Sequence, residues 1–352
     1  MTSDAPEALE ELVFDTKGDV LLILTRHPEG KEKGKDVPNE SGSSKRKSPD
    51  DVSKNVTMLV SSKHLTLASP VFEIMLGDGR FKEGVELLAQ GKVEIELPDD
   101  DPVALAIVLN VIHHINKLVP EEIALPLLTE VAILTDKNQL SETMRWVSTS
   151  WLSRLDGWYK YRGSLYTFLF ISLAFRNAPM FANLTLEAIW LSNENFGSDI
   201  KSQHRLPRSI INAIKKARIQ IPSDVFAALH NFLERKIELA SYCNDQSDVC
   251  GFMTTGSFLK SLAVNRCWPF PSPPYSGINI RDLLNNISKI EILTWCEGED
   301  FGDIQGAIEP GKGCINRQMF TKMVRARIEE IKENITGLDV ENFQREIRRR
   351  GI

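Results

Sequence analysis

The chain has 352 residues, 42% of them hydrophobic and 26% charged, and a formal net charge of −6. This length is sufficient for two folded regions, and the mild negative charge gives no reason to expect a nucleic-acid-binding protein. The N-terminus is polar and acidic and lacks the apolar core of a signal peptide, and the most apolar run, residues 165–175, is shorter than the ~20 residues of a membrane helix. We therefore expect a soluble, intracellular protein, cytoplasmic or nuclear.

The first ordered elements predicted are strands. Residues 20–24 form a short apolar run, and residues 56–60 alternate between apolar and polar side chains. Both patterns predict strands, which would pair as a hairpin. Between them, residues 25–55 are rich in Lys, Glu, Gly, Ser and Pro, so we expect a disordered loop. Strict alternation over residues 93–97 predicts a third strand with one solvated face.

Helices are predicted on both sides of that third strand. Residues 63–77 have the pattern of two short helices, the second beginning with Ser69 as N-cap and Pro70 in its first turn. The same arrangement of Asp101 and Pro102 predicts another helix start. Two further helices are predicted at residues 125–137 and at residues 141–155, the latter capped by Ser141, and a loop is predicted at residues 77–91.

The second half of the chain has helical patterns only. Residues 206–217 are predicted to be helical, Ser223 is predicted to cap a separate helix, and an amphipathic helix beginning near Phe320 is predicted to stop at Gly337. The proline-rich residues 268–276 suggest a rigid, extended connector. The expected organisation is a flexible N-terminus (1–11), a first domain (12–155, with the loop 25–55), a helical region (156–267), the connector (268–276) and a C-terminal helical segment (277–352).

Five short motifs in the first domain resemble those of BTB/POZ domains of the type found in filamentous fungi. They are Gly18-Asp19-Val20, Val60-Ser-Ser-Lys-His-Leu65, Ala68-Ser-Pro-Val-Phe72, Phe81-Lys-Glu-Gly84 and Leu97-Pro-Asp-Asp-Asp-Pro102. The resemblance covers residues 12–155 and implies an α+β BTB/POZ fold, a short sheet with helical hairpins, followed here by a mainly α-helical region. The long loop of residues 25–55 departs from the family, in which many members have a tight turn.

The resemblance implies protein–protein interaction, not catalysis. BTB domains generally associate, often as homodimers, through a face made by the first strand and the first helices. The residues expected to contribute, some of which must instead fill the core, are Val20, Leu22, Leu65, Leu67, Val71, Phe72 and Phe81. Two partner classes are implied. One is a cullin scaffold, with the chain as a substrate adaptor for ubiquitin ligation, and the other is transcriptional or chromatin machinery.

Polar clusters that suggest chemistry each have a plainer explanation. Lys63-His64 has no nucleophile nearby in sequence, and the resemblance implies that His64 packs beneath the helical pair. His113 and His114 point about 100° apart on a helix and cannot readily chelate one ion, so a helix-end role is expected. Asp99–Asp101 fits a strand exit and helix cap better than a cation site. The chain also lacks phosphate-loop, dinucleotide and nucleophile-elbow motifs, so we expect no enzyme and no cofactor.

The five cysteines leave one question about metal binding open. Cys243, Cys250, Cys296 and Cys314 could converge on zinc in the fold, although their spacing does not match a zinc knuckle. Ordinary buried or free thiols are the default expectation.

A short basic cluster lies in the loop expected to be disordered. Lys45, Arg46 and Lys47 could serve as a nuclear-import signal, and Ser48-Pro49 beside them could be phosphorylated. The alternative is a solvated polar loop without a targeting role.

Overall fold

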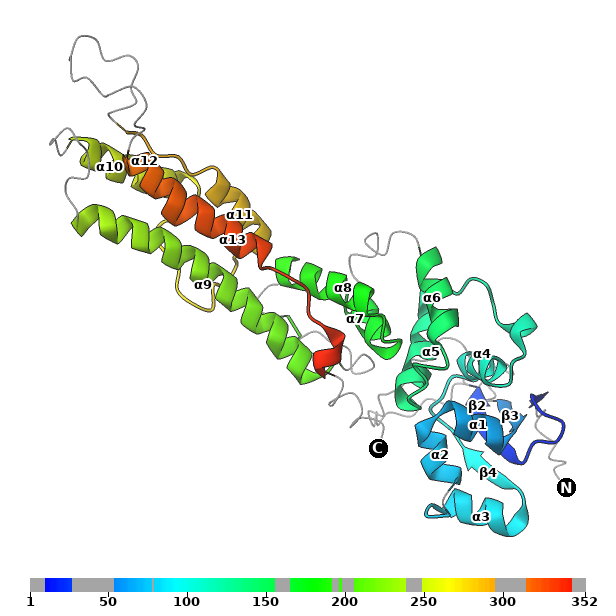
Figure 1. Cartoon of the computed structure of the whole chain (residues 1–352). Coiled ribbons are helices and arrows are strands. Elements are labelled where there is room, and N and C mark those ends of the chain that lie inside the picture. Colours follow the sequence, from blue (N-terminus) through cyan, green and yellow to red (C-terminus); the bar gives the residue numbers. More distant parts are fainter. Residues whose placement is uncertain are drawn as a thin grey trace, which may run out of the picture. The chain divides into compact units, whose positions relative to one another are not determined.

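The computed structural model describes residues 10–26, 54–77, 79–155, 165–191, 196–197, 206–238, 249–294 and 315–343. These residues divide into two compact units, unit 1 as far as Asn177 and unit 2 from Ala178 to Phe343 (Figure 1). Unit 1 holds a small sheet surrounded by helices, and the described part of unit 2 is helical. This mixture of a small sheet and many helices is compatible with the α+β class predicted from the sequence.

The sheet of unit 1 has four strands in the order β1-β3-β2-β4. The strands are β1 Glu10–Val13, β2 Val20–Arg26, β3 Lys54–Val60 and β4 Val93–Glu96. β2 and β3 pair antiparallel as the predicted hairpin, and β4 runs parallel to β2. The register places Leu22 beside both Met58 and Ile95, so the buried sides of three strands coincide. The edge strand β1 was not predicted, because its short, mostly exposed sequence has no apolar alternation.

The helix starts predicted at Ser69-Pro70 and at Asp101-Pro102 are confirmed. α1 is Ser62–Ala68, α2 is Pro70–Leu76, α4 is Pro102–Ile112 and α5 is Leu125–Lys137. The Ser69 hydroxyl accepts a hydrogen bond from the Phe72 N–H, and Asp101 Oδ1 accepts one from the Ala104 N–H at 2.8 Å. These caps satisfy backbone donors that the first turn of a helix leaves unpaired.

Two predictions in unit 1 were wrong. Residues predicted to be a loop contain helix α3, Lys82–Gln90, because Gly84 is there for close packing and not to break the helix. A Cβ at Gly84 would lie 2.9 Å from the Met75 carbonyl oxygen of α2. Helix α6 is Arg145–Arg154, so Ser141 does not cap it. The turn before α6 is held by Thr143, whose hydroxyl donates to the Ala68 carbonyl at 2.9 Å.

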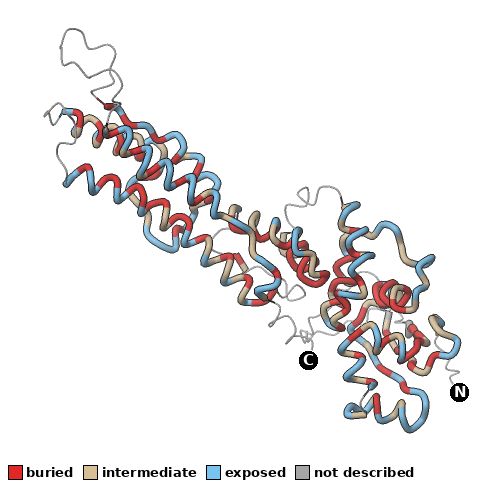
Figure 2. The backbone as a smooth tube through the Cα atoms, in the orientation of Figure 1, coloured by how far each residue is buried: buried red, intermediate tan, exposed pale blue. Residues whose placement is uncertain are grey.

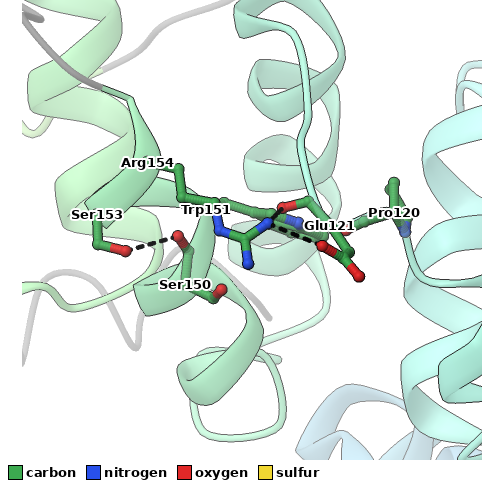
Figure 3. A network of polar contacts seen from close by, with 6 residues as sticks. All are labelled: Pro120, Glu121, Ser150, Trp151, Ser153 and Arg154. Carbon is green, nitrogen blue, oxygen red and sulfur yellow. Dashed lines mark hydrogen bonds and ion pairs between the residues drawn. The ribbon is translucent and has the colours of Figure 1, made fainter.

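The C-terminal turns of α6 are fixed to the segment that precedes α5 (Figure 3). Trp151 Nε1 donates to the Pro120 carbonyl at 2.8 Å, and Arg154 donates to the Glu121 carbonyl at 3.1 Å and its carboxylate at 3.3 Å. Beyond α6, helix α7 (Leu165–Ala174) packs on α5. The compact unit therefore continues to Asn177, past residue 155, where the resemblance ends.

Unit 2 is built around one long helix. Its elements are α8 Ala178–Leu191, α9 Arg208–Glu238, α10 Val249–Val264, α11 Ile280–Ser288, α12 Ile315–Phe320, the π-helical turn η4 Thr321–Arg325, α13 Ala326–Glu333 and η5 Val340–Phe343. α9 packs against α8, α10, α11, η4 and α13. Figure 2 shows its buried side as an interrupted stripe along the helix. Four residues of the predicted amphipathic face, Phe320, Val324, Ile328 and Ile331, are buried, whereas the fifth, Ile335, is half-buried and lies beyond the end of α13.

Three expectations for this half need correction. α9 runs without a break through Pro222 and Ser223, so Ser223 does not cap a helix. The proline lacks an N–H, but its ring is buried in the apolar side of the helix, and that packing offsets the lost hydrogen bond. Residues 268–276 connect α10 to α11 within unit 2, but they turn at residues 273–274 and place Phe270 and Tyr275 against the ring of Phe226, so the connector is packed and not extended.

The third correction concerns Gly337, which does not end α13, because that helix stops at Glu333. The backbone at Gly337 approaches α8 so closely that a Cβ would lie 1.9 Å from the Ala182 carbonyl oxygen. The glycine therefore allows the chain after α13 to pack against α8.

Candidate interaction surface

Four of the seven predicted interaction residues lie in the core of unit 1. Val20 and Leu22 are buried in the inner strand β2, and Leu65 and Phe72 are buried on the inner sides of α1 and α2. Residues two apart in a strand share a face, and in β2 that face is covered by other elements of the same chain. These four side chains are therefore not available to a partner.

The other three predicted residues are accessible to different degrees. Leu67 on α1 is 89% exposed and Phe81, the N-cap residue of α3, is 49% exposed. Val71 on α2 is half-buried. An exposed aromatic or large aliphatic side chain next to others of its kind is a feature of interaction sites, whereas single exposed apolar residues are ordinary.

The structure shows two further apolar residues beside Phe81. Val85 is 52% exposed and Leu88 is 72% exposed, both on α3. The spacing of Phe81, Val85 and Leu88 is i, i+4 and i+7, which places them on one side of the helix. We call these three residues the α3 stripe. The sequence analysis missed Val85 and Leu88 because it predicted a loop, although the helical spacing was present as a signal.

α3 is held to the rest of unit 1 through Gly84, its one buried residue. Gly84 lies against α2, and α3 also contacts β4. The N-cap backbone is extended, and the helix ends at Gly91 in the left-handed conformation, which favours glycine. The α3 stripe is thus presented on a helix whose position is fixed by the fold, which reduces the entropy lost on binding.

Charged side chains border the α3 stripe. Lys82 is exposed and Glu86 is half-buried, and their i, i+4 spacing places both along one flank of the stripe. Glu83 lies on the side of the helix away from the stripe. No salt bridge joins Lys82 or Glu86 to another residue within the described ranges. Charged residues beside an apolar patch are common at the rim of an interface.

His64 and His113 lie against one another in unit 1. Their rings stack with centroids 4.9 Å apart. The Ser61 N–H donates to His113 Nε2 at 3.2 Å, so Nδ1 carries the proton and donates to the Leu109 carbonyl at 3.0 Å. Burial lowers the pKa of His113, and its hydrogen bond to Leu109 opposes this shift. His113 thus has the expected helix-end position, as the C-cap of α4, where it links β3 and α1 to α4.

Asp100 and Asp101 of the acidic cluster make contacts within the fold. Asp101 caps α4, and the buried carboxylate of Asp100 forms a salt bridge with Lys137 at 2.8 Å. In the described part of the chain, no group of three or more His, Cys, Asp or Glu side chains could hold a metal ion.

Of the proposed zinc ligands, only Cys250 lies within the described residues, where it is buried and its sulfur accepts a hydrogen bond from Asn316 Nδ2 at 3.2 Å. Cys243, Cys296 and Cys314 lie outside them, as do Lys45, Arg46 and Lys47. The remaining cysteine, Cys267, is a buried thiol, and burial raises its pKa to about 11. At neutral pH it is therefore protonated and a poor nucleophile or metal ligand.

Unit 2 contains an open depression of about 420 Å³ between α9 and the η4–α13 segment. Its border includes Asp224, Arg327 and Glu330, and Arg327 pairs with Glu330 at 2.6 Å. The adjacent charges thus neutralise one another, and the geometry does not point to a particular ligand.

No helix in the described ranges combines the length and the apolar character needed to cross a lipid bilayer. The chain matches no protein-family model, no curated protein and no solved structure.

Proposed function

We propose that the chain is a protein–protein interaction protein with a BTB/POZ-type domain in unit 1, and that it has no catalytic role. The observation that carries this proposal is the α3 stripe, an exposed apolar surface with charged residues on one flank, on a helix that contacts α2 and β4. Exposed apolar surface costs free energy in water, and covering it is the main favourable contribution to association.

The assignment to the BTB/POZ class rests on motifs and on the order of elements. The β2–β3 hairpin, the helix pair joined at Ser69, strand β4 and the helix capped by Asp101 follow one another as the resemblance implies. This sequence of elements supports the proposal together with the five motifs.

The proposed role is that of a self-associating adaptor, with unit 1 binding a cullin-type scaffold and unit 2 holding the substrate for ubiquitin ligation. Lys45, Arg46 and Lys47 favour a second candidate, a nuclear co-regulator without a ligase role. Neutralising these three residues should exclude a fluorescently tagged chain from the nucleus only if they act as an import signal.

A pull-down of the N-terminal half of a cullin scaffold by the full-length tagged chain tests the proposal. Capture is expected from the wild type, and at least tenfold weaker capture from Val85→Glu/Leu88→Glu, because charge opposes burial of the stripe. The matched control is Val264→Glu, which changes a 72% exposed residue of α10 and should leave capture unchanged. Absence of capture by the wild type would remove the ligase role. Equal capture by all three would show that the α3 stripe is not the surface.

A further inference from the structure

We infer that unit 2 binds an arginine side chain of a partner protein at a surface formed by Trp268, Phe270, His230 and Glu234. We call these four residues the aromatic site. The inference rests on the proposed function and deepens it, because it assigns the substrate-holding role of unit 2 to one surface. It also names the chemistry of the substrate, which is an exposed arginine.

Three aromatic rings meet at this surface. The ring centroids of Trp268 and Phe270 lie 5.0 Å apart with the ring planes at 76°, and the His230 ring lies 5.7 Å from Phe270 at 85°. Trp268 is 42% exposed, the side chain of His230 is 54% exposed, and Phe270 is half-buried. The faces of the Trp268 and Phe270 rings carry partial negative charge, so a cation that reaches them from the solvent is attracted.

A carboxylate lies beside the His230 ring. Glu234 follows His230 by one turn of α9, and its Oε1 is 3.1 Å from His230 Nε2. The Glu234 side chain is 55% exposed, so its carboxylate can also accept hydrogen bonds from a bound group. A guanidinium uses both features of the site, because it stacks on an aromatic face and donates two parallel hydrogen bonds to a carboxylate. A lysine ammonium has neither the flat face nor the paired donors, and should bind more weakly.

The described part of the chain does not itself supply this cation. The cation–π contacts found there lie over Phe232 and Phe320, and not over a ring of the aromatic site. No lysine or arginine of the same ranges forms a salt bridge with Glu234. The rings and the carboxylate are therefore available to a cation from another protein.

The fold positions the aromatic site before anything binds. The Phe226 ring of α9 lies 6.0 Å from Phe270 and 5.8 Å from Tyr275, and Phe226 and Tyr275 are both buried. Arg218, also on α9, donates to the Ile278 carbonyl at 3.2 Å, just beyond the connector. These contacts hold the connector beside α9 (Figure 1). Rings that are fixed in advance lose less entropy on binding.

Packing of the connector accounts for the inner rings but not for Trp268. Tyr275 is buried, as expected of a ring that only fastens a loop to the core. Trp268 remains exposed, and a single exposed apolar residue would be ordinary. Here, however, it lies in one cluster with a second exposed ring and an exposed carboxylate. This combination is what favours a cationic partner.

NMR of the full-length chain with 15N-labelled tryptophan is the first test, since the chain has six tryptophans and each gives one indole signal. The probe is a peptide with blocked ends and one arginine among glycine and serine residues. The signal that is missing in Trp268→Ala identifies the Trp268 indole, and titration of the wild type should shift this signal more than any other. Equal shifts of all the indole signals, or no shift of the Trp268 signal, would overturn the inference.

Two further peptides test the chemistry of recognition. Citrulline has nearly the shape of arginine without its charge, so the citrulline peptide should bind roughly fivefold more weakly or worse. The lysine peptide should bind roughly twofold more weakly or worse. If either peptide binds as tightly as the arginine peptide, the guanidinium is not what the site recognises and the inference is wrong.

Variants of the chain, compared through the signals of the peptide itself, test the residues. Trp268→Ala and Glu234→Gln should each weaken binding of the arginine peptide roughly two- to fivefold. Glu234→Gln changes one exposed side chain, so its result does not depend on the packing of the connector. The matched controls are Trp146→Ala, at an 84% exposed residue of unit 1, and Glu333→Gln, at an exposed residue of α13. Controls that weaken binding as much as the site variants would contradict the assignment.

The outcome for the proposed function is separate. A chain that captures the cullin fragment but does not bind the arginine peptide would refute the aromatic site and leave the adaptor role standing. A chain that binds the peptide but does not capture the fragment would remove the ligase role and leave the aromatic site as a binding surface.

Discussion

Strand β2 and helix α3 belong to the same unit and both carry regularly spaced apolar residues, but the chain uses them in opposite ways. The apolar residues at alternate positions of β2, beginning with Val20 and Leu22, are completely buried, whereas Val85 and Leu88 of α3 are exposed. β2 is hydrogen-bonded on both sides, by β3 and by β4. The main contacts of α3 are with α2 and β4, and its stripe is exposed.

The comparison shows what residue spacing can and cannot tell. A repeat of apolar residues every two positions in a strand, or every 3.6 positions in a helix, shows which side chains share a face. Whether that face is covered depends on elements elsewhere in the chain. A Leu in β2 therefore stabilises the fold, and a Leu in α3 is available for a partner.

The largest difference between β2 and α3 is expected when one leucine in each is truncated and the losses of stability are compared. Leu22→Ala should lower the free energy of unfolding by about 2–5 kcal/mol, because it opens a cavity on the buried face of the sheet. Leu88→Ala should change it by less than about 0.5 kcal/mol, since the side chain is in water. Urea denaturation of both variants gives the two values. Similar losses for the two would mean that α3 is covered within one chain.

A glycine substitution tests whether the inner side of α3 is packed as tightly as the strands. Gly84→Ala should lower the free energy of unfolding by about 1–3 kcal/mol through crowding. The higher helix propensity of alanine should offset about 1 kcal/mol of this loss. Gly256→Ala in α10 is the control, because no atom lies within 4 Å of the position that its Cβ would take, and only the stabilising effect remains. Thermal unfolding of both variants should therefore show shifts of opposite sign. A stabilised Gly84→Ala would contradict close packing of α3 on α2.

The smallest expected effect is a pH dependence of the free energy of unfolding, which arises from His113 next to the core of unit 1. The pKa of His113 is lowered in the fold, while in the unfolded chain it has the ordinary value of about 6.5. As pH falls below 6.5 the unfolded chain takes up the proton first, so the free energy of unfolding decreases until pH passes the lowered pKa. Protonation also removes the acceptor of the Ser61 N–H.

Urea denaturation between pH 5 and 8 measures this effect. His113→Gln should flatten the dependence, because an amide does not titrate there, and His114→Asn, at the exposed neighbour, should leave it nearly unchanged. Asp15 raises the pKa of His113, and His64 and His114 lower it. Asp15 and His64 are present in all three chains, and His114→Asn removes the smallest of these three effects. An unaltered slope in His113→Gln would assign the acid sensitivity to another group.

Several elements were determined by the sequence alone. The starts of α2 and α4 follow from a capping side chain and a proline in consecutive positions, Ser69-Pro70 and Asp101-Pro102. The hairpin of β2 and β3 follows from apolar runs and alternation. These features are local, since a cap satisfies donors within its own turn and alternation is a property of one strand.

Other features were decided only by the tertiary structure. Gly84 and Gly337 reflect the approach of another helix, and α9 continues through Pro222 because the apolar side of the helix is buried around it. Leu22 and Leu88 are the same type of residue, and only the tertiary structure determines that Leu22 is buried and Leu88 is exposed. In each case the deciding contact comes from residues distant in the chain, and the free energy of burial depends on where those residues lie.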